Sequence, residues 1–173
     1  GTLYINGDLT VDGGFSVAVG SLDLSTYNPN ITFNDNVSIG SFTKGTGTLT
    51  FAGSSIRYII AGGNLGNIVI ASNRRLDYPL QAGNITINSG YQLNANNYDI
   101  TLSGNWTNNG TMIYPGTVTF NGTNQSILGS TTFNNLTKVA TGAHTLTFDN
   151  AVNQIVTCSL SLQGQKGASL LSL

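Results

Sequence analysis

A short apolar-polar-apolar triplet recurs along the chain, usually flanked by Asn, Asp or Thr. It reads Leu9-Thr10-Val11 near the start and Ile31-Thr32-Phe33 one step later. Alternation with a period of two is typical of a β-strand, in which the first and third residues face one side and the central residue faces the other. Further copies begin at residues 49, 68, 85, 100, 118 and 136, so that consecutive copies are 15 to 22 residues apart.

This spacing predicts a parallel β-solenoid in which each triplet lies one turn above the last. Strands stacked in this way run parallel, and no regular two-residue hairpin turn separates them. We expect an all-β fold, a right-handed parallel β-helix with about 17–18 residues per turn and about nine to ten turns. The first residues of the triplets should form one buried column, made of Leu9, Ile31, Leu49, Ile68, Ile85, Ile100, Val118 and Leu136.

A longer period overlies the triplets. The segment 47–53 matches the segment 116–122 at a shift of 69 residues, and Ile31 and Ile100 are related by the same shift. We interpret this shift as a four-turn super-repeat within a single solenoid segment that spans residues 1–173. Clusters such as Gly62-Gly63-Asn64 lie between the triplets, and they are typical of corners at which the backbone needs a positive φ.

The composition fits a folded chain with an unusually uncharged surface. Hydrophobic residues make up 39% of the chain, whereas charged residues make up 8% and Glu is absent. Globular domains usually carry about 25% charged residues, so Asn, Thr, Ser and Gly must supply the polarity here. With a net charge of -1 and no basic cluster we expect no nucleic-acid partner. No apolar run reaches the roughly 18 residues of a membrane span.

The residues that could carry catalysis are dispersed along the sequence. His144 is the only histidine and Cys158 the only cysteine, and neither belongs to a known catalytic or metal-binding motif. We expect Cys158 to be a small buried residue. The acids are expected to be solvated strand ends: Asp8, Asp12, Asp23, Asp35, Asp77, Asp99 and Asp149. The sequence therefore predicts no catalytic residue, no metal, no cofactor and no enzyme activity.

The central residues of the triplets form one candidate surface. The sequence predicts an outward threonine ladder of Thr10, Thr32, Thr50, Thr86, Thr101, Thr119 and Thr137. Flat ranks of threonine are typical of ice-binding solenoids. Threonine is also a common outward residue of any strand, and Val69 interrupts this ladder. We therefore keep ice binding as the minor alternative.

Aromatic residues form a second candidate surface. Five of them are concentrated in one part of the chain and could stack on sugar rings: Tyr78, Tyr91, Tyr98, Trp106 and Tyr114. The competing interpretation is packing in the core and in the loops, because the bodies of Trp and Tyr are largely buried in most proteins. Surface glycans are accordingly one class of partner that we consider.

Three segments together resemble the degenerate repeats of very large bacterial surface proteins: 104–111, 116–122 and 131–137. These proteins include adhesins similar to filamentous haemagglutinin and the passengers of autotransporters. The resemblance implies a right-handed β-helix outside the cell or on its surface, which acts as a rod, stalk, sheath or filament module. A carbohydrate-binding or polysaccharide-cleaving β-helix is the alternative.

The two ends of the sequence are apolar where an exposed strand edge would normally be charged. Thr2–Ile5 and Ser169–Leu173 contain no charged residue and no proline. Unprotected strand edges recruit other strands. We therefore expect the ends to be covered by further solenoid turns or by identical chains stacked end to end.

Overall fold

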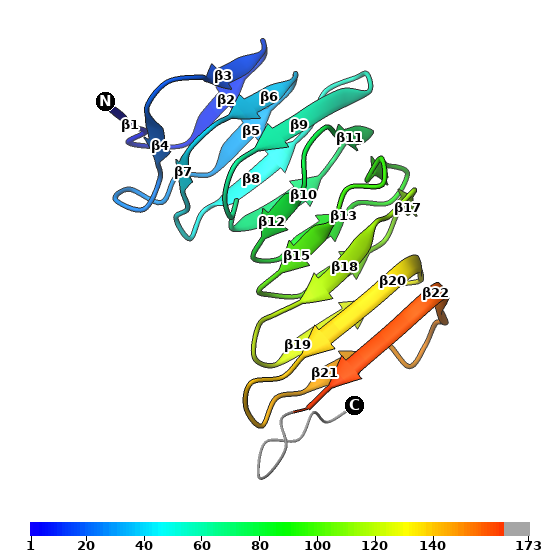
Figure 1. Cartoon of the computed structure of the whole chain (residues 1–173). Coiled ribbons are helices and arrows are strands. Elements are labelled where there is room, and N and C mark those ends of the chain that lie inside the picture. The colour runs from blue at the N-terminus through cyan, green and yellow to red at the C-terminus, as the bar shows by residue number, and fades with distance from the viewer. Residues whose placement is uncertain (165–173) are drawn as a thin grey trace.

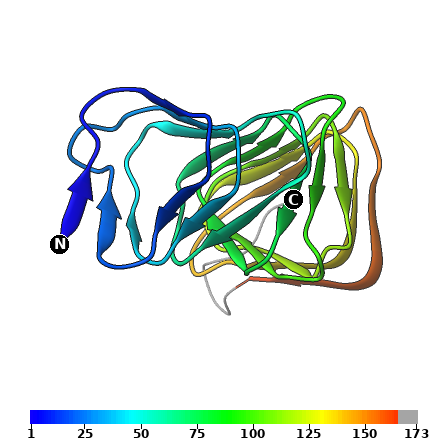
Figure 2. The same cartoon turned by 90° about the horizontal axis from the view of Figure 1, so that it is seen from above.

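The chain forms a parallel β-solenoid, and the computed structural model describes residues 1–164 of it. The described part contains strands and no helix. Every strand pair is parallel, and the turns are stacked from β1–β3 at one end to β21 and β22 at the other (Figure 1). Seen from above, the chain runs around a closed contour whose walls are strands and whose corners are loops (Figure 2). The all-β parallel solenoid predicted from the sequence is confirmed.

Three faces enclose the interior. The first face is one eight-stranded sheet. Its strands are β2 (Leu9–Val11), β5 (Ile31–Phe33), β8 (Thr48–Phe51), β10 (Asn67–Ile70), β13 (Ile85–Ile87), β16 (Trp106–Asn108), β19 (Gln125–Leu128) and β21 (Leu146–Phe148). The second face is a six-stranded sheet. It is made of β3 (Phe15–Val17), β6 (Val37–Ile39), β9 (Arg57–Ala61), β11 (Arg74–Leu76), β14 (Gln92–Asn94) and β17 (Thr111–Ile113).

The third face consists of a three-stranded and a five-stranded sheet. The first contains β1 (Thr2–Tyr4), β4 (Ser21–Asp23) and β7 (Phe42–Thr43), and the second contains β12 (Leu80–Ala82), β15 (Ile100–Leu102), β18 (Thr117–Phe120), β20 (Thr131–Val139) and β22 (Gln154–Gln163). Between the two sheets, Asn64 forms an isolated parallel bridge to Gln81. The chain visits the faces in the same order on each turn, and β20 and β22 are long because each continues around a corner.

The solenoid has about eight turns, fewer than the nine to ten that we predicted, because its turns are longer than 17–18 residues on average. Hydrogen bonds between equivalent positions of neighbouring turns give the turn lengths directly. Asn30 and Asp8 are 22 residues apart, Asn84 and Asn67 are 17 apart, and Asn105 and Asn84 are 21 apart. With strands spaced about 4.8 Å apart, eight turns give a stack roughly 35 Å long.

The predicted buried column exists, but it is divided between two faces. On the first face the register runs through Leu9, Ile31, Leu49, Ile68, Ile85, Trp106, Ile127 and Phe148. On the third face it runs through Leu80, Ile100, Val118, Leu136 and Leu160. Ile85 and Ile100, which are 15 residues apart, therefore lie on different faces of the solenoid and are not stacked on each other. The 69-residue shift likewise relates first-face strands to third-face strands.

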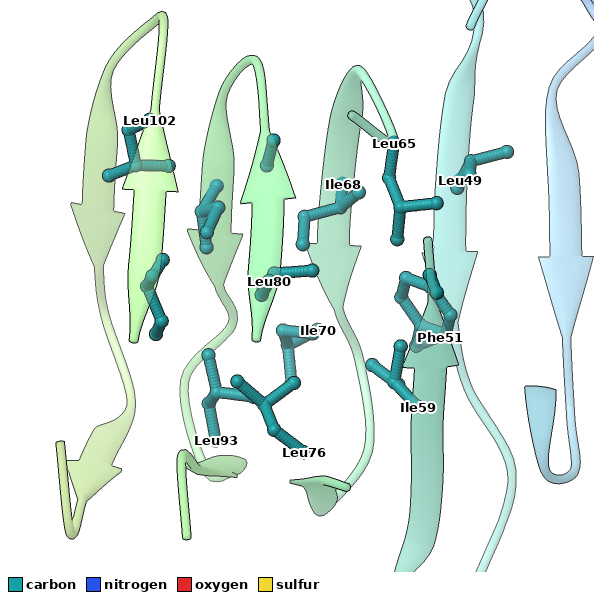
Figure 3. Close-up of a cluster of buried hydrophobic side chains, with 14 of the residues drawn as sticks. Leu49, Phe51, Ile59, Leu65, Ile68, Ile70, Leu76, Leu80, Leu93 and Leu102 are labelled. Carbon is teal, nitrogen blue, oxygen red and sulfur yellow. The ribbon is translucent and has the colours of Figure 1, made fainter. Parts of the chain in front are cut away.

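Both columns point into one continuous apolar core. Ile70 of the first face lies beside Leu76 and Leu93 of the second face there, whereas Leu49 and Ile68 lie on either side of Leu65, and all six side chains are almost fully buried (Figure 3). Aromatic rings lie along the core at one end, where Phe33 and Phe51 are stacked with centroids 5.7 Å apart. Burying such side chains contributes about 1.5–3 kcal/mol each.

The buried side chain of Arg74 cross-links backbone segments at the corner between the first and second faces. The Arg74 guanidinium donates to the carbonyl oxygens of Asp35 at 2.6 Å and Phe33 at 2.8 Å, and also to that of Ala52. Its Nε donates to Ser72 Oγ at 3.0 Å. Phe33 ends β5, and Asp35 and Ala52 lie in the loops after β5 and β8, so one side chain binds carbonyls of two neighbouring turns.

Burial makes this cation unusual. Arg74 is 1% exposed and its guanidinium lies 5.6 Å from the centroid of the Phe51 ring. Desolvation lowers the pKa of Arg74 to about 10, and the nearby Arg57 acts in the same direction while Asp35 opposes it. The side chain is still a cation at neutral pH, and its hydrogen bonds offset the cost of burying the charge.

Replacing Arg74 by Met should lower the free energy of unfolding by about 3 kcal/mol, because several buried carbonyls lose their donor at once. Equilibrium unfolding in urea, followed by circular dichroism, measures this change. The neighbouring Arg75→Met is the matched control, because Arg75 is exposed and forms a surface ion pair with Asp77. Equal effects of the two substitutions would contradict the role assigned to Arg74.

Candidate functional site

The threonines predicted as one ladder occupy two faces. Thr10, Thr32, Thr50 and Thr86 are in register on the first face, with Val69 between the last two. The next position in that rank is Thr107, which the sequence pattern missed because its neighbour Asn108 is polar although it is buried. The remaining three form a separate rank on the third face: Thr101, Thr119 and Thr137. The structure therefore contains two shorter ranks in place of one long ladder.

Asparagines beside the first-face rank are already engaged with neighbouring turns. Asn84 Nδ2 donates to Asn67 Oδ1 at 2.7 Å, and Asn84 Oδ1 accepts from the backbone N–H of Asn105 at 2.6 Å. Asn105 Oδ1 in turn accepts from the backbone N–H of Ser126 at 2.9 Å. These hydrogen bonds connect the corners of successive turns, so the asparagine amides stabilise the solenoid.

Three of the five predicted aromatics gather at one corner. Tyr78, Tyr98 and Tyr114 lie on successive turns between the second and third faces, after β11, β14 and β17. Tyr78 and Tyr114 are exposed, whereas Tyr98 packs partly against the core. Tyr114 has a positive φ of 49°, which shows how tightly the chain turns here.

The other two aromatics are separated from this corner. Trp106 is fully buried in the first-face column, where it packs 6.0 Å from Phe133 and its Nε1–H donates to Thr131 Oγ1 at 2.9 Å. It cannot contact a glycan in this fold. Tyr91 lies at the opposite corner, between the first and second faces, and is 39% exposed.

Tyr91 lines a cavity of about 340 Å³ on the outside of this corner. The other lining residues come from loops on three consecutive turns: Gly53, Ser54, Ser55, Ile56, Ser72, Asn73 and Gly90. No pattern in the sequence indicates this cavity, because its loops meet only through the stacking of three turns. In the structure β9 begins only at Arg57, which leaves Ser54–Ile56 as a loop.

A second buried cation, Lys138, cross-links backbone segments at the corner between the third and first faces. Lys138 Nζ donates to the carbonyl oxygens of Gly122 at 2.6 Å and Thr123 at 3.0 Å, and to Gln125 Oε1 at 2.6 Å. Burial lowers the pKa of Lys138. Because its side chain is enclosed, Lys138 serves the fold and presents no charge to a ligand.

The acids do not converge on a shared site. Among residues 1–164 no three His, Cys, Asp or Glu side chains gather as they would around a metal ion. Asp8 accepts two hydrogen bonds from Asn30 on the next turn, and these bonds lower the pKa of Asp8. Asp35 pairs with Arg57 at 2.6 Å, and Asp77 pairs with Arg75 at 2.7 Å.

The sole cysteine is exposed, and the expectation that it is buried was wrong. Cys158 lies in β22, the last described strand, at a register irregularity. Phe133 pairs with Val156, but Asn135 pairs with Ser159, so β22 carries an extra residue at this bulge. The expectation depended only on the usual burial of free cysteine, whereas Cys158 lies in β22, the edge strand of its sheet among the described residues.

One end member of each buried column is open to solvent. Leu9 is 37% exposed although Ile31, its partner on the next turn, is fully buried. Leu160 is 56% exposed although its partner Leu136 is fully buried. Leu3 on β1 is 46% exposed. Ser169–Leu173, the other apolar segment expected at an end, lies outside the described residues.

Comparisons with protein-family models, with curated proteins and with solved structures found no match to this chain. The described residues contain no helix capable of crossing a membrane. Among the described residues, exposed apolar or aromatic side chains are found at the end turns, at the corner with the three tyrosines and at the Tyr91 cavity.

Proposed function

We propose that this chain is a structural or adhesive module of an extracellular or cell-surface protein, which acts as part of a rod, stalk, sheath or filament. Its support is a single apolar core that runs through about eight parallel turns and remains exposed at Leu9 and Leu160. A surface with few charges and many Asn, Thr and Ser side chains fits this role, as does the resemblance to bacterial surface repeats.

The exposed ends are the observation that carries the proposal. β1, β2 and β3 are the edge strands of their sheets, so their outer N–H and C=O groups have no strand partner among the described residues. Leu3, Tyr4 and Leu9 add exposed apolar side chains to this edge. Further turns or an identical chain would satisfy both the backbone groups and the side chains.

Carbohydrate binding is the second candidate, and the Tyr91 cavity favours it over cleavage. Hydrolysis of a glycosidic bond requires two carboxyl groups about 5–10 Å apart around the bond, or an equivalent acid and base. No acid lines the cavity. Ice binding remains the minor alternative, because the division of the threonines between two faces shortens each rank.

End-to-end stacking predicts that the 173-residue chain associates in solution, and that Leu3→Lys with Leu9→Lys weakens the association at least tenfold, because charge at an edge strand opposes pairing. Sedimentation velocity over a hundredfold concentration range measures the association of the parent chain and of the double variant. Leu128→Lys is the matched control, since Leu128 is an exposed leucine on the side of the first face. A parent chain that stays monomeric, indistinguishable from the double variant, would contradict stacking.

The proposal that the chain is not an enzyme predicts no turnover. Incubation with neutral and acidic polysaccharides and with ester substrates, with and without Ca²⁺, should release no product above a buffer control. Chromatography of the soluble sugars and a colorimetric ester assay provide the readouts. If product is released and a single Asp→Ala substitution abolishes the release, the chain is an enzyme and that aspartate is required for its catalysis.

A further inference from the structure

We propose that the cavity at Tyr91 binds a neutral sugar unit of a surface glycan, with the tyrosine ring against the apolar face of the sugar. This inference deepens the proposed adhesive role by assigning it a site and a ligand class. It rests on the cavity's position, on its volume and on the chemistry of its lining.

The cavity is built by the stacking of the turns. Its walls come from the loop between β8 and β9, the loop between β10 and β11, and the loop between β13 and β14. Gly53 has a positive φ of 103°, and a Cβ added there would overlap the carbonyl oxygen of Asn34. A larger residue at Gly53 is therefore excluded, which keeps this wall close to the turn beneath it.

The volume and the apolar part of the lining suit one sugar ring. Ligand sites typically measure about 300–1,000 Å³, and this cavity of about 340 Å³ lies at the small end of that range. Tyr91 and Ile56 contribute exposed apolar surface. A pyranose presents C–H groups on one face, so it can cover an aromatic ring while its hydroxyl groups reach polar partners at the rim.

Polar groups for those hydroxyls lie beside the ring. Asn73 Oδ1 accepts from the backbone N–H of Gln92 at 3.0 Å, which orients the carboxamide. Asn73, Ser54 and Ser55 are exposed, so the Asn73 Nδ2 and the two hydroxyls are accessible to a ligand. These groups can donate and accept, as recognition of a polyol requires.

The lining also indicates the charge of the ligand. None of the residues around the cavity is ionisable near neutral pH. An acidic sugar would leave its carboxylate without a charged partner, whereas a neutral hexose or pentose needs none. Tyr78 and Tyr114 are exposed but do not line this cavity.

The test uses the 173-residue chain with four neutral hexasaccharides, built of glucose, mannose, galactose and xylose, and with hexagalacturonate as the acidic probe. Saturation-transfer NMR detects binding and calorimetry measures Kd. At least one neutral probe should bind. Tyr91→Ala should then raise its Kd at least tenfold, Tyr91→Phe should retain binding, and Tyr78→Ala should leave Kd unchanged as the matched control.

A second variant fills the cavity without altering Tyr91. Ser55→Trp lies in an exposed loop and should also raise Kd at least tenfold while the thermal unfolding midpoint stays that of the parent. No binding of any neutral probe at millimolar concentration overturns the proposal, as does binding that survives both Tyr91→Ala and Ser55→Trp, or binding of hexagalacturonate alone. Sedimentation tests stacking separately, so a chain that stacks without binding sugar contradicts only this inference.

Discussion

The backbone ladder between parallel strands one turn apart is the interaction on which the rest of the structure depends. Each strand hydrogen-bonds to the strands of the turns above and below, so a residue that faces inward must stack on an inward residue of the next turn. Turn length is free to vary only at the corners. The 22 residues between Asp8 and Asn30 and the 17 between Asn67 and Asn84 are accommodated there without loss of register on the first face.

The corners therefore collect the polar chemistry of the molecule. Carbonyl oxygens at strand ends and in the loops that follow them accept hydrogen bonds from the buried cations Arg74 and Lys138. Outside, Asn84 and its neighbours link successive turns. Because Arg74, Lys138 and these asparagines are engaged within the solenoid, the ligand site that we propose lies on a loop surface, at Tyr91.

Much of the fold could be predicted from the sequence, because an apolar-polar-apolar triplet such as Ile31-Thr32-Phe33 indicates a β-strand with one buried face. The stacking partners could not be predicted fully. Trp106-Thr107-Asn108 is the first-face strand above Ile85, yet the buried Asn108, which donates to Ser130 and Thr131, hides the alternation. The cavity was also beyond prediction, since its loops meet only through the register of three turns.

Disulfide trapping of the register tests the account most directly. In a Cys158→Ser background, Thr86→Cys with Thr107→Cys places two thiols on directly paired positions of adjacent strands, within the Cα separation that a disulfide requires. Thr86→Cys with Thr101→Cys instead places them on different faces. Mass spectrometry after mild oxidation should show a cross-link in the first pair alone. A cross-link in the second pair and none in the first would contradict the stacking described here.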